Sequence, residues 1–355
     1  MRVRLEDVCE KESSKLKQSD VINQNGLYPV YGASGYLGNI NTYQQSNYYI
    51  AVVKDGAGIG RTMLLPPESS IIGTMQYLIP KDNVLPEYLY YVVKAKHLEK
   101  YFSGATIPHI YFKDYKNEQF DLVSFDEQRE IINRLKKIEI IIDNLSKNLL
   151  LLDELVRARF VEMFGDPIEN QKDWEVVKIR DIVTDVRYGT SKPAVEGGRY
   201  PYLRMNNLTV DGGLDLSDLK YIDIPDNEIE KCVVRKGDIL FNRTNSIDLI
   251  GKTAVFNLLD DMVIAGYIIR IRLNNQILPD VFSQYMNLEA MKKVLRGMAK
   301  GAVNQANINA QELQSIKVYI PNMELQKQYV EFKEEIDKSR LLSNHSLFLI
   351  KSITF

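Results

Sequence analysis

The stretch "IINRLKKIEIIIDNLSKNLLLLDELV", residues 131–156, determines how this chain is organised. Its apolar residues recur at alternating spacings of four and three positions, which is the pattern of a heptad seam on a helix. The seam comprises Ile131, Leu135, Ile138, Ile142, Leu145, Leu149, Leu152 and Val156. We predict one helix that starts at Asp126, its cap, and runs to Phe164 over about 58 Å, where Gly165 and Pro167 end it.

An apolar seam of this length has to be covered, and the chain offers a second long helix at about residues 322–352. The second seam is weaker: Tyr329, Phe332, Ile336, Leu347 and Ile350 fit the pattern, whereas Lys333, Arg340 and Ser343 interrupt it. We expect the helices to pair within the chain and, if its halves are related by an approximate two-fold axis, to run antiparallel. The alternatives are ordinary core packing of a long helix and a coiled coil with another subunit.

The chain also repeats itself, which changes the meaning of every local motif. "GLYPVYGAS" (26–34) is echoed by "GRYPYLRMN" (198–206), and "VVKDGAGIGRTMLL" (52–65) by "VVRKGDILFNRTNSIDLIGKTAVF" (233–256). Each copy begins with short apolar runs, at 48–53, 237–242 and 267–273, whose alternation predicts half-buried strands. A helical patch follows, at 87–102 and 280–297, and then the long helix.

This order predicts an α+β fold with a pseudo-two-fold internal repeat. Two similar mixed α/β domains, built mostly of strands, are separated by two long antiparallel helices that form a coiled coil. We place the first domain at 1–125, the central helix at 126–165, the second domain at 166–320 and the C-terminal helix at 321–355.

Two glycine-rich stretches, "DGAGIGRT" (55–62) and "SIDLIGKT" (246–253), look like nucleotide-binding loops. A phosphate loop needs a glycine five positions before its Gly-Lys-Ser/Thr ending. Asp55 and Ser246 occupy that position, and Asp55 would repel phosphate. We therefore interpret both stretches as copies of one structural turn.

Composition narrows the class of protein. The net charge of −2 argues against a protein that simply coats nucleic acid, although a basic groove can be balanced by acidic residues elsewhere. The two cysteines, Cys9 and Cys232, and the three histidines are too dispersed to indicate a disulfide framework or a metal site. We find no signal peptide or membrane-length apolar run and expect a cytoplasmic protein.

Across essentially the whole chain, this order of segments resembles the specificity subunit of type I restriction-modification systems. The pieces that carry the resemblance are "MFGDP" (163–167) followed by Trp174, "VRYGTSKP" (186–193), "YPYLRMNNL" (200–208) and "GDILFNRTNSIDLIGKTAVF" (237–256). The first copy lacks an equivalent of "FNRTNS", so its DNA contacts are expected to differ from those of the second.

The resemblance implies a non-catalytic subunit with two target-recognition domains, each of which reads one half of a split double-stranded DNA sequence. The long helices would act as a spacer and as the docking surface for two copies of an adenine methyltransferase subunit, which brings S-adenosylmethionine. A restriction and translocase subunit that uses ATP and Mg²⁺ can join. We find no methyltransferase active-site motif and expect no cofactor and no metal on this chain itself.

Base edges are read by Arg, Lys, Asn and Gln side chains on loops, and phosphates by polar side chains and backbone N–H groups. The second domain has four clusters of this composition. We predict DNA contacts from Arg187, Tyr188, Gly189, Thr190, Ser191, Lys192, Arg204, Asn206, Asn207, Arg243, Thr244, Asn245, Ser246, Asn304, Gln305 and Asn307. At Gly189 a tight turn could bring backbone N–H groups near a phosphate.

In the first domain the matching candidates are Ser34, Tyr36, Lys54, Arg61, Thr62, Thr106, His109 and Tyr111. For every cluster the structural alternative is a turn, because Asn, Ser and Thr favour turns for local backbone bonding. Two other functions stay open: a coiled-coil adaptor that binds no DNA, and a nucleotide-hydrolysing enzyme. The near-neutral charge predicts that the isolated chain binds DNA weakly.

Overall fold

The computed structural model describes the whole chain except residues 105–107, 303–304 and 355, and the side chains of 353–354. Contacts divide it into two compact units: Met1–Asn144 with Leu349–Phe355, and Leu145–Phe348. The boundary falls inside a long helix because the two ends of that helix pack on different cores. Ile132 belongs to the first core, whereas Phe160 and Phe164 belong to the second.

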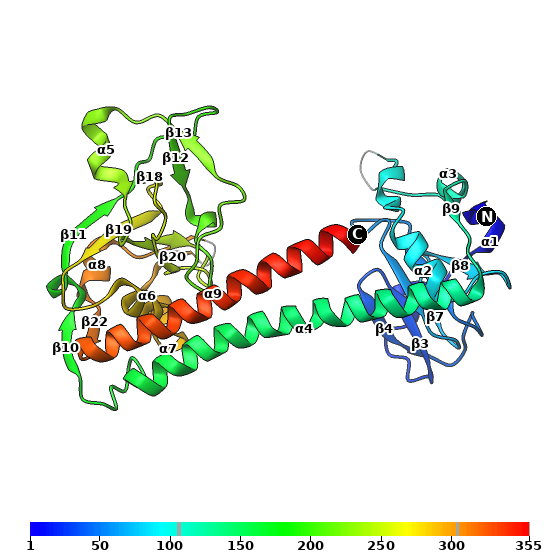
Figure 1. Cartoon of the computed structure of the whole chain (residues 1–355), viewed down its shortest axis with the longest axis horizontal. Helices are drawn as coiled ribbons and strands as arrows, with labels where there is room; N and C mark the ends of the chain where they lie inside the picture. Colours follow the sequence, from blue (N-terminus) through cyan, green and yellow to red (C-terminus); the bar gives the residue numbers. More distant parts are fainter. Residues whose placement is uncertain (105–107, 303–304, 355) are drawn as a thin grey trace. The chain divides into compact units, whose positions relative to one another are not determined.

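The first domain runs from β1 to β9 and places two sheets face to face (Figure 1). Its strands are β1 (Arg2–Arg4), β2 (Cys9–Ser13), β3 (Tyr28–Gly32), β4 (Gly35–Ile40), β5 (Tyr49–Val53), β6 (Thr62–Leu65), β7 (Ser70–Ile71), β8 (Met75–Pro80) and β9 (Gln119–Asp121). Its helices are α1 (Leu5–Val8), η1 (Gln18–Asp20), α2 (Pro86–Lys94), η2 (Leu98–Tyr101) and α3 (Phe112–Tyr115). The sheet β2-β8-β5-β6 packs on α2 with one face and towards the sheet β4-β3-β7 with the other.

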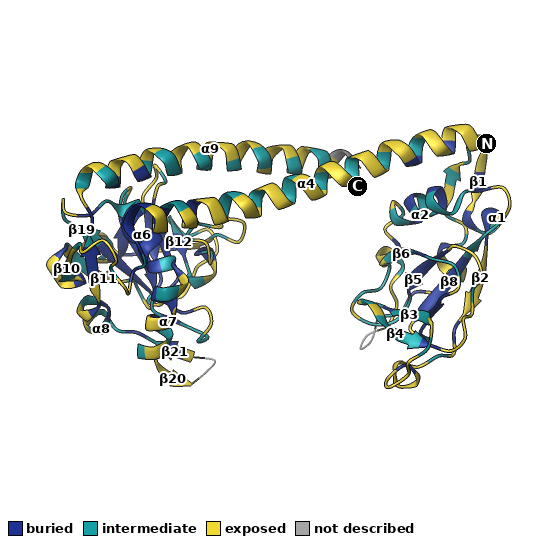
Figure 2. Cartoon of the chain, turned by 90° about the horizontal axis from the view of Figure 1, so that it is seen from below, coloured by how far each residue is buried: buried dark blue, intermediate teal, exposed yellow. Residues whose placement is uncertain are grey.

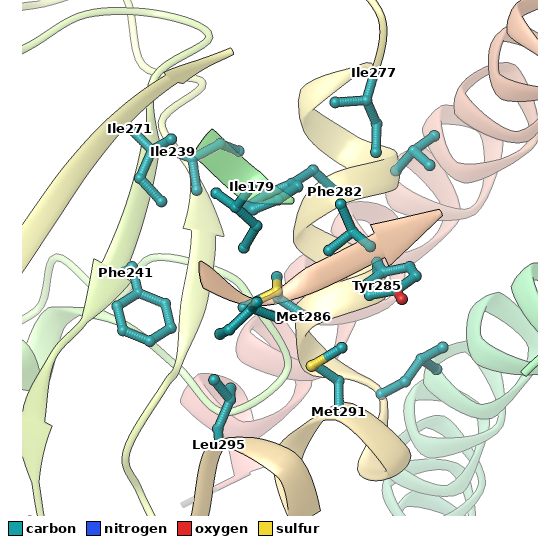
Figure 3. Packing of buried hydrophobic residues seen from close by; sticks show 14 of the residues in the cluster. Ile179, Ile239, Phe241, Ile271, Ile277, Phe282, Tyr285, Met286, Met291 and Leu295 are labelled. Atoms are coloured by element: carbon teal, nitrogen blue, oxygen red, sulfur yellow. The ribbon is translucent and has the colours of Figure 1, made fainter. Parts of the chain in front are cut away.

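The second domain runs from β10 to β22 and has the same plan with longer connections. Its strands are β10 (Glu175–Lys178), β11 (Val183–Tyr188), β12 (Tyr200–Leu203), β13 (Lys220–Ile222), β14 (Val233–Val234), β15 (Ile239–Asn242), β16 (Thr244–Asn245), β17 (Thr253–Val255), β18 (Met262–Ile264), β19 (Ile268–Leu273), β20 (Lys300–Ala302), β21 (Gln305–Asn307) and β22 (Lys317–Ile320). Its helices are η3 (Ile179–Asp181), η4 (Met205–Asn207), α5 (Asp226–Cys232), α6 (Pro279–Asn287), α7 (Glu289–Met298) and α8 (Ala310–Ser315). Figure 3 shows the core between its sheet and helices, with Ile239 on the side of the sheet and Phe282 and Met291 on the side of the helices.

The central strands are more buried than predicted. Every residue of β5 and of β15 is buried, as the dark blue ribbon of β5 shows in Figure 2. The prediction of half-buried strands is wrong because each strand lies between two layers. In β15, Ile239 and Phe241 face the helices, whereas Leu240 joins the cluster under the second sheet.

Each predicted helical patch is interrupted. The first breaks at His97, whose φ of +50° is left-handed, so α2 is followed by the separate short helix η2. The second breaks at Leu288, whose backbone is extended, so α6 and α7 are distinct helices.

The long helices are α4 (Phe125–Phe164) and α9 (Met323–Thr354). Asp126 is not the cap of α4: Ser124 Oγ accepts from the Glu127 N–H at 3.4 Å, and the Glu127 carboxylate accepts from the Ser124 N–H at 3.0 Å. The predicted stop is confirmed, since Gly165 follows the helix with φ +85°. The indole of Trp174 donates to the carbonyl of the last residue of the helix, Phe164, at 2.9 Å.

Within the second unit the two long helices run antiparallel (Figure 1). The rings of Phe160 and Tyr329 lie 5.3 Å apart, and Arg340 donates to the Asp153 carboxylate at 2.6 Å. Residue numbers therefore fall along α4 in the direction in which they rise along α9. Arg340 was predicted to interrupt the seam, but it bridges the helices. At the other end of α4, Ile131 and Leu135 pack on the first domain's core, a role that the heptad interpretation did not assign them.

The internal repeat is confirmed by hydrogen bonds that recur at equivalent backbone atoms. Gly60 and Gly251 each donate to the last residue of a central strand, to Val53 at 2.9 Å and to Asn242 at 2.9 Å. The reverse bonds, from the Val53 N–H to Arg61 and from the Asn242 N–H to Lys252, measure 2.9 and 2.8 Å. Both glycines have positive φ, +81° and +76°. The glycine-rich stretches are therefore the same hairpin turn.

Candidate nucleic-acid interface

The second domain contains a cleft of about 610 Å³ into which several predicted DNA-contact residues converge. It lies where the segment after β11, the turn η4, and the ends of β15 and β18 meet. Six predicted residues line it: Thr190, Ser191, Lys192, Arg204, Asn206 and Arg243. The others that line it are Pro193, Ala194, Tyr202, Met205, Ala265, Gly266 and Tyr267.

Arg243 is fixed at the wall of the cleft by contacts on several sides. Its guanidinium donates to Asn307 Oδ1 at 3.0 Å and to the Gly266 carbonyl at 3.3 Å. Its central carbon lies 4.9 Å from the centre of the Tyr188 ring, a cation–π arrangement. A guanidinium held in this way is pre-organised to donate to an acceptor such as a base edge or a phosphate.

Arg204 is held by an acid that the sequence did not single out. Its Nη2 donates to the Asp218 carboxylate at 2.7 Å and to the Asp218 carbonyl at 3.0 Å. Hydrogen bonds from Lys220 and Arg204 lower the pKa of Asp218, so this acid stays ionised beside the guanidinium. The Nε atoms of Arg204 and Arg243 are buried and have no hydrogen-bond partner in the part of the chain that the structure describes.

The remaining wall of the cleft is polar and aromatic. The Tyr202 hydroxyl donates to the carbonyls of Thr190 and Lys192, at 3.2 and 3.1 Å, and holds their segment in place. Lys192 pairs with Glu228 at 2.9 Å. Tyr267 is 50% exposed at the cleft, where its ring offers a flat surface for stacking.

Several predicted residues serve the fold. Asn207 is 2% exposed. Its side chain accepts a hydrogen bond from the Arg204 N–H at 2.8 Å and donates one to the Asp215 carbonyl at 2.8 Å. Thr244 is 7% exposed within β16. Asn245 accepts from the Ser246 N–H at 2.9 Å and donates to Asn242 Oδ1 at 2.9 Å. Asn207 and Asn245 thus make local hydrogen bonds within turns, which was the structural alternative for these clusters.

The expectation for Gly189 is wrong. Its N–H donates to the Ile268 carbonyl at 3.1 Å, and the Thr190 N–H donates to Ile264 at 2.9 Å, so neither can bind a phosphate. The glycine is needed because a Cβ atom there would lie 2.2 Å from the Ile264 carbonyl oxygen.

The other candidates of the second domain lie around Arg243 or on the surface. Tyr188 stacks on Arg243 and accepts a hydrogen bond from the Ala310 N–H at 2.8 Å. Arg187 is exposed and pairs with Asp185 at 2.9 Å. Gln305 is exposed on β21, whereas Asn307 on the same strand binds Arg243. Asn304 lies outside the described residues.

The first domain arranges its candidates in two groups. Ser34 and Tyr36 are exposed at the β3–β4 hairpin, next to Ala33, whose carbonyl accepts from Arg61 at 2.7 Å. Gly35, which starts β4 in this hairpin, has φ +110°. The Thr62 hydroxyl donates to the Gly60 carbonyl at 3.1 Å and stays within the turn.

The second group of the first domain surrounds His109. His109 Nδ1 lies 2.7 Å from the Asp55 carboxylate, and Lys54 lies 3.8 Å from the same acid. The Tyr111 ring stacks beside His109 at 6.4 Å and is 48% exposed. Thr106 lies outside the described residues.

Sequence reasoning missed Tyr267, Tyr202 and Asp218. Tyr267 follows Gly266 between two strands, where a lone aromatic residue gives no signal of exposure. Asp218 is 14 positions from Arg204, and only the folded chain brings the two together. Cysteine, histidine and carboxylate side chains among the described residues form no group of three or more that could hold a metal ion. No described helix combines the length and apolarity needed to cross a membrane.

A family model for the type I restriction modification DNA specificity domain matches residues 1–151 and 171–349, one match on each half of the repeat. The chain belongs to this family. It is 32% identical over 173 residues to the putative type I restriction enzyme MjaX specificity subunit of Methanocaldococcus jannaschii, which covers 48% of this chain but only 40% of that protein. The EcoKI specificity subunit of Escherichia coli is 20% identical over 319 residues, 82% of this chain and 68% of that protein.

Solved structures share the fold of the specificity family over the full chain. The specificity subunit of M. genitalium aligns with a TM-score of 0.59 at 15% identity and covers 100% of this chain and 93% of its own. A chain from a study of assembly and conformational transition of the type I system aligns with a TM-score of 0.61 at 16% identity, over 95% of its length. These likenesses support the α+β fold with two similar domains and long helices.

Proposed function

We propose that this chain is the sequence-recognition subunit of a type I restriction-modification enzyme and reads a bipartite DNA target, one half with each domain. The observation that carries the proposal is a duplicated scaffold with different side chains at its exposed turns. The turn after β12 presents Arg204 and Asn206, whereas at the equivalent positions the first domain has the buried Gly32, which ends β3, and the exposed Ser34. One scaffold with two sets of side chains suits a target whose halves differ in sequence.

The chemistry of the second domain's cleft supports binding to base edges and phosphates. Two anchored guanidiniums, Arg204 and Arg243, can bond the acceptors of guanine or a phosphate, and Asn206 can bond adenine or a backbone oxygen. The exposed ring of Tyr267 adds a stacking surface. Each bidentate contact of this kind discriminates between bases by about 1–3 kcal/mol.

The long helices support the docking of partner subunits. Large apolar side chains stay exposed on them outside the paired seam: Ile140, Ile141, Leu150, Leu151 and Leu155 on α4, and Leu341, Leu342 and Phe348 on α9. Apolar surface of this extent on a helix is typical of an interaction site. We propose that two adenine methyltransferase subunits dock there, and that a restriction and translocase subunit joins the assembly.

In this proposal the chain does no chemistry itself. S-adenosylmethionine binds to the methyltransferase subunits, and ATP with Mg²⁺ binds to the restriction subunit. The turn that resembles a phosphate loop supports this division, because Lys252 in it is buried and donates to two backbone carbonyls.

Salt-dependent binding to duplex DNA tests the proposal against an adaptor that binds no DNA. We expect the chain alone to bind weakly, because its net charge is −2, and the complex with its methyltransferase to bind tightly and lose affinity steeply as salt rises. Fluorescence anisotropy with a pool of random duplexes, followed by selection, measures both. Failure of the complex to enrich any sequence would contradict the proposal.

A further inference from the structure

The glycine-rich turns end in a basic residue, Arg61 in the first domain and Lys252 in the second. Equivalent hydrogen bonds place these two residues at the same position of the repeated hairpin, immediately after Gly60 and Gly251. In each turn the following threonine also donates to the glycine carbonyl, at 3.1 and 3.0 Å. The local geometry is therefore the same although the basic residue differs.

Both basic side chains reach the same distant backbone position. Arg61 donates to the Ala33 carbonyl at 2.7 Å, and Lys252 donates to the Met205 carbonyl at 2.7 Å. Ala33 and Met205 are equivalent, because the bonds two residues earlier in each chain segment correspond: Ile72 N–H to Tyr31 at 3.0 Å and Ala265 N–H to Leu203 at 2.9 Å. The next residues are Ser34 and Asn206, both exposed candidates for DNA contact.

We propose that Arg61 and Lys252 are positioning residues that brace the two DNA-contacting turns, Ala33–Ser34 and Met205–Asn206, from behind. They act through the backbone carbonyl and do not themselves bind phosphate. The inference rests on the proposed function, since it assumes that these turns face DNA. It gives the motif that looks like a phosphate loop a role in sequence specificity.

The second domain shows the stronger form of this brace. Lys252 is 7% exposed, and its ammonium donates both to Met205 and to the Leu208 carbonyl at 2.5 Å, so it spans the whole of η4. Asn207 closes the same turn from the other side through the Arg204 N–H. Arg204 and Asn206 thus project from a turn that is fixed at both ends.

A brace matters here because base recognition depends on accurate placement of short side chains. Removing the Lys252 ammonium would leave the buried Leu208 carbonyl and the half-buried Met205 carbonyl without this partner and free the turn to shift. Arg61 is exposed and has one such bond, so its loss should affect the first half-site less than the loss of Lys252 affects the second.

The test compares Lys252→Met, Lys252→Arg, Arg61→Met and Arg61→Lys, each expressed as full chain with its methyltransferase in a host that lacks adenine methylation. Methylated adenines are mapped genome-wide. We expect Lys252→Met to reduce discrimination at positions of one half-site about tenfold or more and to leave the other half-site unchanged. Arg61→Met should reduce discrimination in the half-site that the first domain reads, by a smaller factor, and leave the half-site of the second domain unchanged. The Lys252→Arg and Arg61→Lys variants should keep the wild-type motif, because each domain already uses the other's residue.

Lys317→Met, a lysine substitution on β22 of the same domain, controls for the loss of one positive charge. The midpoint of thermal unfolding shows whether each variant folds, and the exposed Arg61 provides a test that does not depend on a buried site. The inference is overturned if both methionine variants leave base preference intact, or if they lower methylation evenly across all sites, as lost phosphate contacts would. A wild-type map without a two-part motif would instead contradict the proposed function.

Discussion

The two recognition domains share a backbone but differ in what they display on it. At the position of Arg204 the first domain has Gly32, and at the position of Arg243 it has Lys54, as the equivalent bonds of Ile110 to Lys54 and Ile308 to Arg243, both 2.9 Å, establish. By contrast, the backbone hydrogen bonds that support these positions recur in both domains with nearly the same lengths. The comparison shows that scaffold and specificity are carried by separate residues, so one can change without the other.

The attachment of each domain to its long helix follows the same rule. Gln128 accepts from the Leu85 N–H at 2.9 Å, and Gln326 accepts from the Leu278 N–H at 2.8 Å, just before α2 and α6 respectively. Both amides also donate to the carbonyl five residues earlier, Val123 at 3.0 Å and Pro321 at 2.8 Å. Each glutamine ties the start of its long helix to its own domain.

The exchange of one whole domain should have the largest effect, and it tests whether the two domains act separately. Replacing residues 183–320 by the segment of another family member should change one half-site completely and leave the other half-site and the spacing as they were. Methylation mapping measures the result, and a matching exchange of residues 9–122 is the control. If either exchange altered both half-sites, the domains would not read independently.

The buried glutamines should give the largest effects on stability. Gln326→Ala should lower the free energy of unfolding of the second domain by about 3 kcal/mol, because the Leu278 N–H and the Gln276 and Pro321 carbonyls lose their partner. Gln128→Ala should act in the same way on the first domain. Hydrogen exchange resolves the two domains, and Gln314→Ala on α8 is a milder control. Equal destabilisation of both domains by one substitution would speak against separate attachment.

Arg204→Ala and Arg243→Ala test whether the cleft of the second domain distinguishes the bases of its own half-site. Each should cost about 1–3 kcal/mol of discrimination in the second half-site and leave the first intact. Competition binding of single-base variants of the target to the methyltransferase complex measures this. Arg235→Ala, which removes an arginine paired with Glu230 and Asp261 outside the cleft, should have no such effect. An unchanged base preference in both cleft variants would remove the cleft from the interface.

The bridge between the long helices should contribute less. Asp153 and Arg340 are 30% and 27% exposed, so solvent screens their attraction, and a double-mutant cycle should give a coupling of up to about 1 kcal/mol. Denaturant unfolding of Asp153→Asn, Arg340→Gln and the double variant supplies the cycle. A coupling of zero would mean that the apolar contacts alone set the antiparallel pairing.

A pH-dependent effect is expected from Lys292, which is buried in the second domain beside Lys252. Burial lowers the pKa of Lys292 to about 7, and Arg296 contributes in the same direction. The unfolded chain, with a pKa near the ordinary lysine value of 10.5, therefore binds more protons between about pH 7 and pH 10.5. Stability from this group should rise with pH across that window, by at most about 1.4 kcal/mol per pH unit.

Thermal unfolding of the wild type and Lys292→Gln between pH 7 and pH 9.5 checks this sign. The advantage of the wild type over the variant should grow as pH rises. A difference that is flat with pH would show that Lys292 keeps its ordinary pKa in the folded chain.

The sequence was sufficient for the repeat, the long helices and the position of the stop at Gly165, because periodicity and internal echoes are properties of the chain itself. The sequence was insufficient where residues of the same type can either stabilise a turn or lie exposed at the cleft. Asn206 and Asn207 are adjacent and identical, yet one is exposed at the cleft and the other is buried under the turn. Only the fold decides which side of a turn faces outward.

The same limit explains the assignment of the long helices. A heptad seam predicted an apolar stripe but not that Ile131 and Leu135 would pack on a domain core instead of the other helix. Likewise, Arg340 looked like a defect in the seam until Asp153 was found opposite. Contacts that join residues 187 positions apart leave no trace in a local pattern.

The most direct measurement of the central claim is the genome-wide map of methylated adenines with and without this chain, in the presence of its methyltransferase subunit. Two fixed half-sites separated by a constant number of unread base pairs should appear only when the chain is present. Methylation at a single uninterrupted motif, or the same motif in the absence of the chain, would contradict it.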